Sequence, residues 1–246
     1  MGVLLCLLPG TSQACGSAPQ FPTYPVAWVY DGDTLRLDDD RKIRLIGVDT
    51  PELGRDGEPG EPYARRALQR LRQLIEHGGQ GVRLRLGTMQ KDRYGRYLAH
   101  VYLPDGRDTA ELLLREGLAH ATVFPPNILH LECLLEAEAQ AREARRGLWR
   151  QARVPDAREL PETTAGFHLV RGRIERVGSS ERALWLNLEG GLGLRIDRKD
   201  LTYFPGLLGQ PLAGRELEVR GWIYRHGGAP RMQVRHGAAI RWLSSG

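Results

Sequence analysis

The stretch DGDTLRLDDDRKIRLIGVDTPE, residues 31–52, decides how the first half of this chain folds. Residues 34–37 and 42–48 alternate apolar and polar side chains as strands do, and the acidic run 38–40 between them is a turn. If that turn closes a hairpin, Asp33 lies beside Leu45 and Arg44, a few residues from Asp49. The stretch therefore predicts two carboxylates and a guanidinium at one edge of a β-meander.

Further strands are predicted on both sides of this stretch, at residues 26–30, 82–86 and 98–102. Three helices are predicted from apolar periodicity and from capping signals. They cover residues 63–77, which Gly78-Gly79 ends, residues 108–117, which a capping box of Asp108 and Glu111 opens, and residues 129–146. Five strands with three helices predict an α+β N-terminal domain built on an OB-fold barrel, spanning residues 23–150.

A second domain is predicted for residues 165–246. Residues 151–164 contain Pro155 and Pro161 and have no periodic apolar face, which indicates a linker. Beyond them, short alternating strands separated by glycine turns are typical of a smaller all-β, OB-like barrel. The predicted strands are 167–174, 183–188, 192–196, 216–224 and 231–234.

The positive charge of the chain is concentrated in this second domain. The whole chain carries 35 Lys+Arg and 30 Asp+Glu, a formal charge of +5. Residues 163–246 hold 13 Lys+Arg and 7 Asp+Glu, so this part alone has +6 and the rest has −1. Such a distribution favours binding of a polyanion by the last third of the chain.

The residues around the first hairpin have the chemistry of phosphodiester hydrolysis. Carboxylates without His or Cys neighbours favour a hard cation, and a flexible rim suits Ca²⁺. Arg44 and Arg96 are candidates for stabilising the negative charge that develops on a phosphate in the transition state. Glu52, which follows the rigid Thr50-Pro51 turn, is a candidate for orienting or deprotonating the attacking water.

Each of these motifs also has a structural explanation. Asp-Gly-Asp is common in turns, an arginine beside an aspartate is an ordinary cross-strand pair, and Asp-Thr-Pro-Glu can open a helix. Tyr-Gly-Arg is equally common in loops. The combination of motifs, rather than any one of them, favours a catalytic site.

The chain from residue 26 to residue 149 resembles the staphylococcal nuclease (thermonuclease) family. The resemblance rests on three ordered motifs, Asp31-Gly32-Asp33-Thr34, Val48-Asp49-Thr50-Pro51-Glu52 and Asp92-Arg93-Tyr94-Gly95-Arg96, and continues through Leu118-Ala119, Pro126-Asn127 and Gly147-Leu148-Trp149. It implies a Ca²⁺ ion held by Asp33, Asp49 and the Thr50 carbonyl. It further implies that Glu52 acts on the water, that Arg44 and Arg96 bind the scissile phosphate, and that DNA and RNA are cut to leave 3′-phosphates.

The nucleotide-binding positions depart from the family's pattern. Where the family has two tyrosines lining the pocket, this chain has Thr122 and Phe124, and only Phe124 can stack on a base. Arg93 and Tyr94, in the turn before Arg96, are further candidates for contact with nucleic acid.

In the second barrel, Trp185 and Trp222 are candidates for base stacking beside its cations, although both could equally be core residues. The predicted role of this barrel is the capture of substrate.

The first residues resemble an export signal. A short apolar run, residues 3–8, is followed by Ser12-Gln13-Ala14, a small-x-Ala cleavage pattern, so residues 1–22 are interpreted as a leader and the protein as periplasmic or secreted. A lipid anchor at Cys15 is the alternative. The apolar run is too short to span a bilayer. Cys6 and Cys15 are expected to leave with the leader, which makes Cys133 a buried free thiol.

The sequence thus predicts a monomeric, exported, calcium-dependent endonuclease acting on DNA and RNA, with single-stranded or denatured substrate preferred. Two other classes remain open. A non-catalytic nucleic-acid-binding module could have the same barrels, although such modules typically lack the carboxylates or arginines that are present here. A protein–protein adaptor built from paired barrels is the third possibility.

Overall fold

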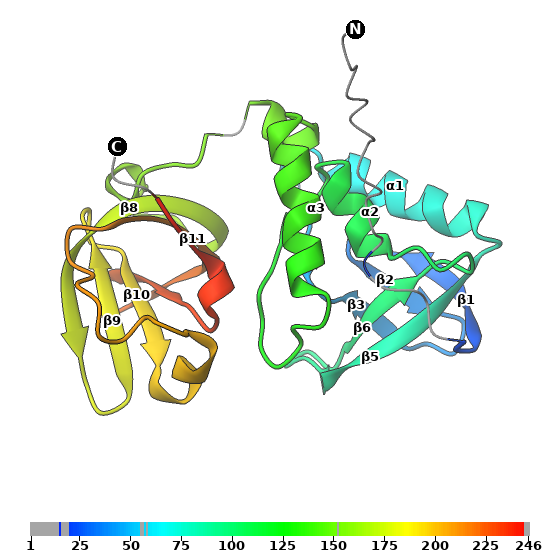
Figure 1. Cartoon of the computed structure of the whole chain (residues 1–246). Helices are drawn as coiled ribbons and strands as arrows, with labels where there is room; N and C mark the ends of the chain where they lie inside the picture. The colour runs from blue at the N-terminus through cyan, green and yellow to red at the C-terminus, as the bar shows by residue number, and fades with distance from the viewer. Residues whose placement is uncertain (1–14, 16–19, 55–56, 58, 152, 244–246) are drawn as a thin grey trace, which may run out of the picture.

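Two β-barrels lie side by side in the computed structural model, and helix α3 runs along the side of the first that faces the second (Figure 1). The structure describes residues 15, 20–54, 57, 59–151 and 153–243. No helix among these residues combines the length and the apolar character needed to cross a bilayer.

The first barrel is closed, with strand order β1-β2-β3-β6-β5. The predicted hairpin is confirmed, because Thr34 lies opposite Arg44 in the β2–β3 pair. Strand β3 then pairs in parallel with β6, which places Arg44 opposite Leu98. The strands are β1 (Thr23–Val29), β2 (Thr34–Leu37), β3 (Lys42–Leu45), β5 (Gly81–Lys91) and β6 (Tyr97–Tyr102).

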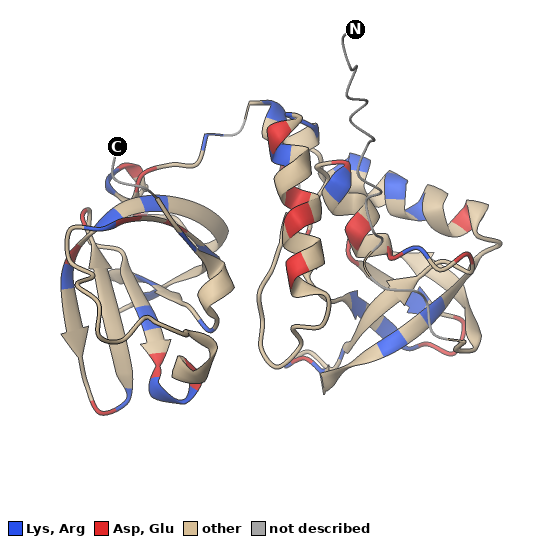
Figure 2. Cartoon of the chain, viewed as in Figure 1, with Lys and Arg blue, Asp and Glu red and all other residues tan. Residues whose placement is uncertain are grey.

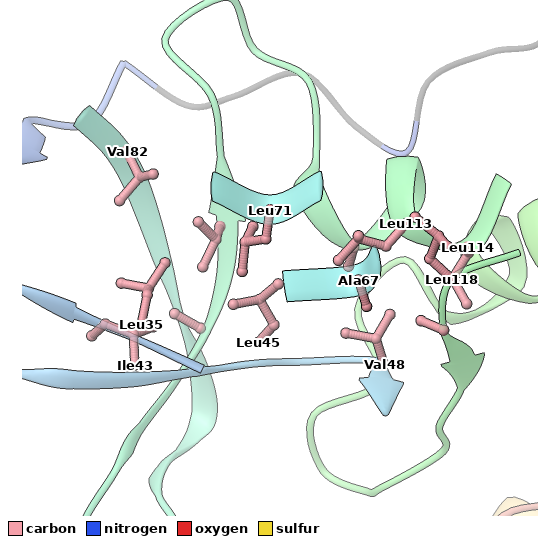
Figure 3. Close-up of a cluster of buried hydrophobic side chains, with 14 of the residues drawn as sticks. Leu35, Ile43, Leu45, Val48, Ala67, Leu71, Val82, Leu113, Leu114 and Leu118 are labelled. Carbon is pink, nitrogen blue, oxygen red and sulfur yellow. The ribbon is translucent and has the colours of Figure 1, made fainter. Parts of the chain in front are cut away.

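Three helices cover this barrel: α1 (Ala64–His77), α2 (Thr109–Arg115) and α3 (Leu131–Glu143). Leu71 of α1 packs with Leu35, Ile43 and Leu45 of the barrel, and all four side chains are buried (Figure 3). Burial of each such side chain contributes about 1.5–3 kcal/mol. This packing fixes the hairpin from which the site residues project.

The predicted capping box of α2 is only half formed. The Asp108 carboxylate accepts hydrogen bonds from the backbone N–H groups of Ala110 and Glu111. The Glu111 carboxylate does not return to Asp108, because it accepts from the Cys15 N–H at 2.6 Å and from Arg115 at 2.7 Å.

The second barrel confirms the OB-like prediction. Strand β12 pairs with both β10 and β11, which closes the sheet. Its strands are β8 (Gly166–Ser179), β9 (Ala183–Leu188), β10 (Gly193–Asp197), β11 (Glu216–His226) and β12 (Ala229–Gln233). A 3-10 helix, η3 (Arg198–Tyr203), and a sixth strand, β13 (Ile240–Trp242), are additions that the alternation of side chains did not predict.

The segment interpreted as a linker packs against the second barrel. It contains a short 3-10 helix, η2 (Ala157–Glu159), whose Ala157 is buried. The Pro155 carbonyl accepts a hydrogen bond from the Arg171 N–H of β8 at 2.8 Å.

Two ion pairs join the barrels. Arg142 of α3 lies 2.6 Å from Glu218 of β11, and Arg220 of β11 lies 2.6 Å from Glu138 of α3. Figure 2 shows acidic residues repeated along α3, the helix that faces the second barrel. Val123 of the first domain also packs against the core of the second barrel, so the contact between the domains is charged as well as apolar.

The expectation for the cysteines is wrong. Cys15 and Cys133 form a disulfide whose two residues are 118 positions apart, with a Cα–Cα distance of 5.5 Å. Cys133 is therefore not a free thiol, and Cys15 is retained in the form that carries this bond. Cys6 lies outside the described residues.

Candidate active site

Arg44 is the centre of the carboxylate cluster. Its Nε lies 3.2 Å from Asp33 Oδ1, and its Nη2 lies 2.7 Å from Asp49 Oδ1. Its Nη1 donates to the carbonyls of Leu45 and Val48. One guanidinium on β3 therefore joins the start of β2, the turn after β3 and strand β4 (Val48–Asp49).

Asp33 is held rigidly at the start of β2. Its Oδ2 accepts hydrogen bonds from the Thr50 N–H at 2.8 Å and from the Thr50 hydroxyl at 2.9 Å. Its Oδ1 accepts from the Thr34 hydroxyl at 3.1 Å. Gly32 permits this approach, since a Cβ there would lie 2.7 Å from the Thr50 side chain and from Ala67 of α1.

The cluster carries more negative charge than Arg44 neutralises. Burial, together with the charges of Asp33 and Glu52, raises the pKa of Asp49 to about 7 despite the contact with Arg44. Burial and the neighbouring Asp33 raise the pKa of Asp31 to about 6. Burial disfavours the charge of Arg44, but Asp33 and Asp49 outweigh it and its pKa is raised. Such an acidic surplus suits a cation.

The donors around the surplus charge are oxygen atoms, which fit a hard divalent cation. The Asp33 and Asp49 carboxylates both contact Arg44, and the N–H of Thr50, the residue after Asp49, donates to Asp33. Within the described residues, the one trio of Cys, His or acidic ligand atoms that lie within 4.8 Å of one another is Cys15, Glu111 and Cys133. Two of these three residues form the disulfide, so that trio is no competing metal site.

Glu52 lies on the exposed rim of the cluster. Its backbone N–H donates to the Glu61 carboxylate at 2.8 Å, which fixes the turn after Pro51. The charge of Glu52 contributes to the raised pKa of Asp49, from which it is three residues away in sequence. A solvent-exposed carboxylate beside the cluster is able to accept a proton from water.

Arg96 approaches the cluster from the turn between β5 and β6. Its Nε lies 2.7 Å from Asp92 Oδ2, and its Nη1 lies 3.5 Å from the Thr34 hydroxyl that donates to Asp33. The structure thus brings Arg96 to the same barrel edge as Arg44, one hydrogen-bonded residue from Asp33.

Arg93 and Tyr94 lie in the same turn as Arg96. Arg93 Nη2 donates to the Tyr94 hydroxyl at 2.6 Å, and the Tyr94 ring is 68% exposed. The Arg96 guanidinium carbon lies 5.5 Å from the centre of that ring. Tyr94 is therefore an exposed aromatic surface directly beside one of the two candidate phosphate-binding arginines.

The two pocket positions differ in exposure. Thr122 is buried, and its N–H donates to the Gly47 carbonyl, whereas Phe124 is 41% exposed. Phe124 contacts the second barrel, where the centre of the Trp222 ring lies 6.4 Å away. Trp222 is itself 40% exposed, and Trp185 is half-buried on β9, so neither belongs wholly to the core.

Two features of the site were not predicted from the sequence. Asp31 is a member of the acidic cluster, a role that its place in the Asp-Gly-Asp motif hinted at. The second feature is strand β7 (His120–Ala121), which pairs with β4 so that His120 lies opposite Asp49. The ring centre of His120 lies 5.8 Å from that of Phe167 on β8, so the second barrel contacts the strand beside Asp49.

Comparison with known proteins supports the resemblance of the first domain. The sequence model of the family described as "Staphylococcal nuclease homologue" matches residues 42–151. The chain is 40% identical over 131 residues to the thermonuclease of Staphylococcus hyicus, which covers 52% of this chain and 75% of that protein. It is 37% identical over 130 residues to the thermonuclease of Staphylococcus intermedius, with 52% and 76% covered. Endonuclease YncB of Bacillus subtilis (strain 168) is 34% identical over 123 residues, with 48% and 57% covered. With the closed five-stranded barrel and the Asp33–Arg44–Asp49 cluster in place, these identities show that the chain belongs to the staphylococcal nuclease family.

Proposed function

We propose that this chain is a calcium-dependent nuclease that hydrolyses phosphodiester bonds of DNA and RNA within the strand and leaves 3′-phosphate ends. The observation that carries the proposal is the position of Arg44, which contacts Asp33 at 3.2 Å and Asp49 at 2.7 Å at a single barrel edge. Membership of the family and the nuclease names of its relatives support the same activity.

Asp33, Asp49 and the Thr50 carbonyl would hold the calcium ion. When bound, the ion would supply positive charge beside the phosphate undergoing attack. The residues of the chain have separate roles around it. Arg44 and Arg96 bind the phosphate oxygens and stabilise the charge that develops on them, and Arg96 is the more exposed of the two and the freer to turn toward a substrate.

Glu52 is the residue proposed to receive the proton of the attacking water, because its carboxylate is exposed beside the cluster. The water oxygen forms a bond to phosphorus, and the bond from phosphorus to the 5′ oxygen breaks. The leaving oxygen takes up a proton and becomes a 5′-hydroxyl, and the phosphate stays on the 3′ side.

Export to an oxidising compartment is part of the proposal. Its support is the Cys15–Cys133 disulfide, since such bonds persist mainly in secreted and periplasmic proteins. Lipid attachment at Cys15 would use the same sulfur atom as the disulfide. We therefore propose the unanchored form for any molecule that carries this bond.

The test is cleavage of denatured DNA and of RNA by purified protein, with calcium and then with excess chelator. End-group analysis of the products should find 3′-phosphates and 5′-hydroxyls. Activity that ignores the chelator would remove the calcium mechanism. Binding without cleavage in calcium would favour the non-catalytic nucleic-acid-binding module instead.

A further inference from the structure

The outer face of the second barrel has aromatic and cationic side chains on neighbouring strands. Trp185 of β9 lies directly opposite Arg195 of β10, and Tyr224 of β11 lies opposite Arg231 of β12. Trp185 lies between buried Leu184 and Leu186, and Tyr224 follows buried Ile223, so both rings project away from the barrel core. Because β12 lies between β10 and β11, the four side chains belong to one continuous surface.

Arg231 is the cation on this face that the protein leaves free. Among the described residues its guanidinium has no ion pair, whereas Arg195 and Arg235 are paired with Asp197 and Asp200. The Arg231 Nε is buried and has no hydrogen-bond partner. The guanidinium carbon instead lies 4.6 Å from the centre of the Trp185 ring. Gly193 makes room for this arrangement, since a Cβ there would lie 2.8 Å from Arg231 Nη1. The charge of Arg231 is therefore not neutralised by a carboxylate, and an anion would bind at its Nη atoms, because Nε is buried.

The same face continues to the nuclease domain. Trp222, two residues before Tyr224 on β11, lies with its ring centre 6.4 Å from that of Phe124. The Arg235 guanidinium, just beyond β12, lies 4.8 Å from the centre of the Phe124 ring. Phe124 is two residues after Thr122. The Thr122 N–H donates a hydrogen bond to the carbonyl of Gly47, which is two residues before Asp49. A strand of nucleic acid on the second barrel would thus reach the first domain beside its candidate active site.

The relative position of the two surfaces is fixed by the ion pairs at the interface. Glu138 and Glu218 are each less than 5% exposed and are contacted by Arg220 and Arg142 across the domain boundary. A rigid connection matters because a tethered but mobile barrel would capture substrate without directing it. Here, the ion pairs hold the aromatic face of the second barrel in one orientation relative to the candidate active site.

We propose that Trp185, Tyr224, Trp222 and Arg231 form a binding track for single-stranded nucleic acid that runs from the second barrel to Phe124. This inference rests on the proposed nuclease function and extends it to a substrate class. Exposed rings stack on unpaired bases, and a free guanidinium between them binds the phosphate backbone. Paired bases in a duplex offer no such stacking surface. The strands β9 and β10 are also the second and third of the barrel, the face on which OB folds bind oligonucleotides.

The test is fluorescence anisotropy with an oligothymidylate of about 16 nucleotides, the upper end of the site size of one OB barrel, in chelator so that no cleavage occurs. Trp185→Ala and Tyr224→Ala should each raise the Kd by about 5- to 150-fold, the effect of losing one stacked base. The matched control is Trp28→Ala, which removes a 53% exposed tryptophan stacked on Arg72 of the first domain and should leave the Kd unchanged. Arg231→Gln should lower the slope of log Kd against log salt by about 0.7, the value for one phosphate contact on a single strand.

Cleavage kinetics give a second readout. Trp185→Ala should raise the KM for long single strands without changing kcat, and should leave cleavage of a dinucleotide unaffected. Track variants that bind the oligonucleotide as tightly as Trp28→Ala would overturn the inference, as would equal affinity of the wild type for a duplex of the same length. A wild type that binds through the track and cuts nothing in calcium would overturn the proposed nuclease function and leave the track standing.

Discussion

Arg220 of the second barrel and Glu138 of helix α3 form an ion pair of 2.6 Å whose two side chains are only 11% and 2% exposed. The other oxygen of Glu138 accepts from the Ala121 N–H at 2.8 Å, and Arg220 donates to the Ala121 carbonyl at 3.0 Å. The pair therefore attaches the second barrel to strand β7, and β7 is paired with the strand of Asp49.

Loss of this pair should destabilise the protein strongly. Arg220→Met leaves the Glu138 carboxylate buried without its cation, which typically costs about 3–5 kcal/mol. Denaturant unfolding measures the change. The control is Arg107→Met, which breaks an ion pair with Asp105 that is more than half exposed and should cost about 1 kcal/mol or less. Equal effects of the two substitutions would contradict the role of Arg220 in attaching the second barrel to the first domain.

Substitution of Arg44 and substitution of Arg96 should have different effects on stability but similar effects on catalysis. Removal of either guanidinium should lower kcat by ~10²–10³, because each is proposed to stabilise charge in the transition state. Arg44→Ala should also cost about 3–5 kcal/mol of folding free energy without calcium, since Asp33 and Asp49 lose their shared partner. The Tm of Arg96→Ala should be close to that of the wild type. Arg36→Ala, which removes a partly exposed arginine of β2 that pairs with Asp40, serves as the control for both measurements. Full activity in Arg96→Ala would exclude its assigned role.

Calcium should stabilise the folded protein by mass action, because the unfolded chain has no assembled site. Thermal melts in calcium and in chelator should therefore differ for the wild type, with a higher Tm in calcium. Asp33→Asn and Asp49→Asn should abolish the difference. Asp39→Asn, in the exposed turn between β2 and β3, should keep it. A calcium-dependent rise in Tm that survives Asp49→Asn would place the ion elsewhere.

Acid should weaken the contact between the domains. Burial favours a neutral Glu218, but hydrogen bonds from Arg142 and Arg241 outweigh it and lower the pKa to about 2. Its stabilising charge is fully present above the ordinary pKa of 4.5 and is lost as the pH falls toward 2. Burial of His120 lowers its pKa to about 4, so the unfolded state gains this proton first and the contribution of His120 to stability declines below about pH 6.5. The raised pKa values of Asp49 and Asp31 contribute in the opposite direction there, so the effect of His120 is read from the difference between wild type and variant.

Thermal unfolding between pH 7 and pH 3 checks both windows. Glu218→Gln should flatten the part of the profile below pH 4.5, and His120→Gln the part between pH 6.5 and 4. Glu132→Gln, at an exposed position of α3, should leave the profile unchanged. A Glu218→Gln profile that still falls as steeply as the wild type below pH 4.5 would refute the assignment.

Reduction of the Cys15–Cys133 disulfide should lower the unfolding free energy by about 2–4 kcal/mol, because the bond restricts a long loop in the unfolded chain. Cys133→Ser should show the same loss, and dithiothreitol should then have no further effect on it. If the reductant destabilises the Cys133→Ser protein as much as the wild type, the stabilisation does not come from this bond.

Local patterns in the sequence were sufficient to predict the hairpin of the candidate active site. Alternation and the acidic turn placed Asp33 next to Leu45, and the Leu45 N–H donates to the Asp33 carbonyl at 2.9 Å. The second barrel followed from the same alternation. These features depend on contacts between residues that are close in sequence or on repeated side-chain periodicity.

Long-range pairings could not be predicted in this way. Cys15 and Cys133 are 118 residues apart, and nothing in either neighbourhood specifies the other. In the sequence, Glu138 has the context of an ordinary helical glutamate, and only the folded structure shows that it pairs with Arg220. The place of Asp31 in the acidic cluster likewise depends on burial, which a turn motif does not reveal.

The second barrel contacts Glu138 and His120 of the first domain, and these contacts determine how its role should be tested. A truncated chain ending before residue 165 would leave a carboxylate without its counter-ion and would uncover His120 where Phe167 now covers it. Its catalytic defects would then mix lost substrate capture with damage to the scaffold of Asp49. Single substitutions on the outward surface keep the two contributions separate, so the C-terminal barrel is best dissected residue by residue rather than removed.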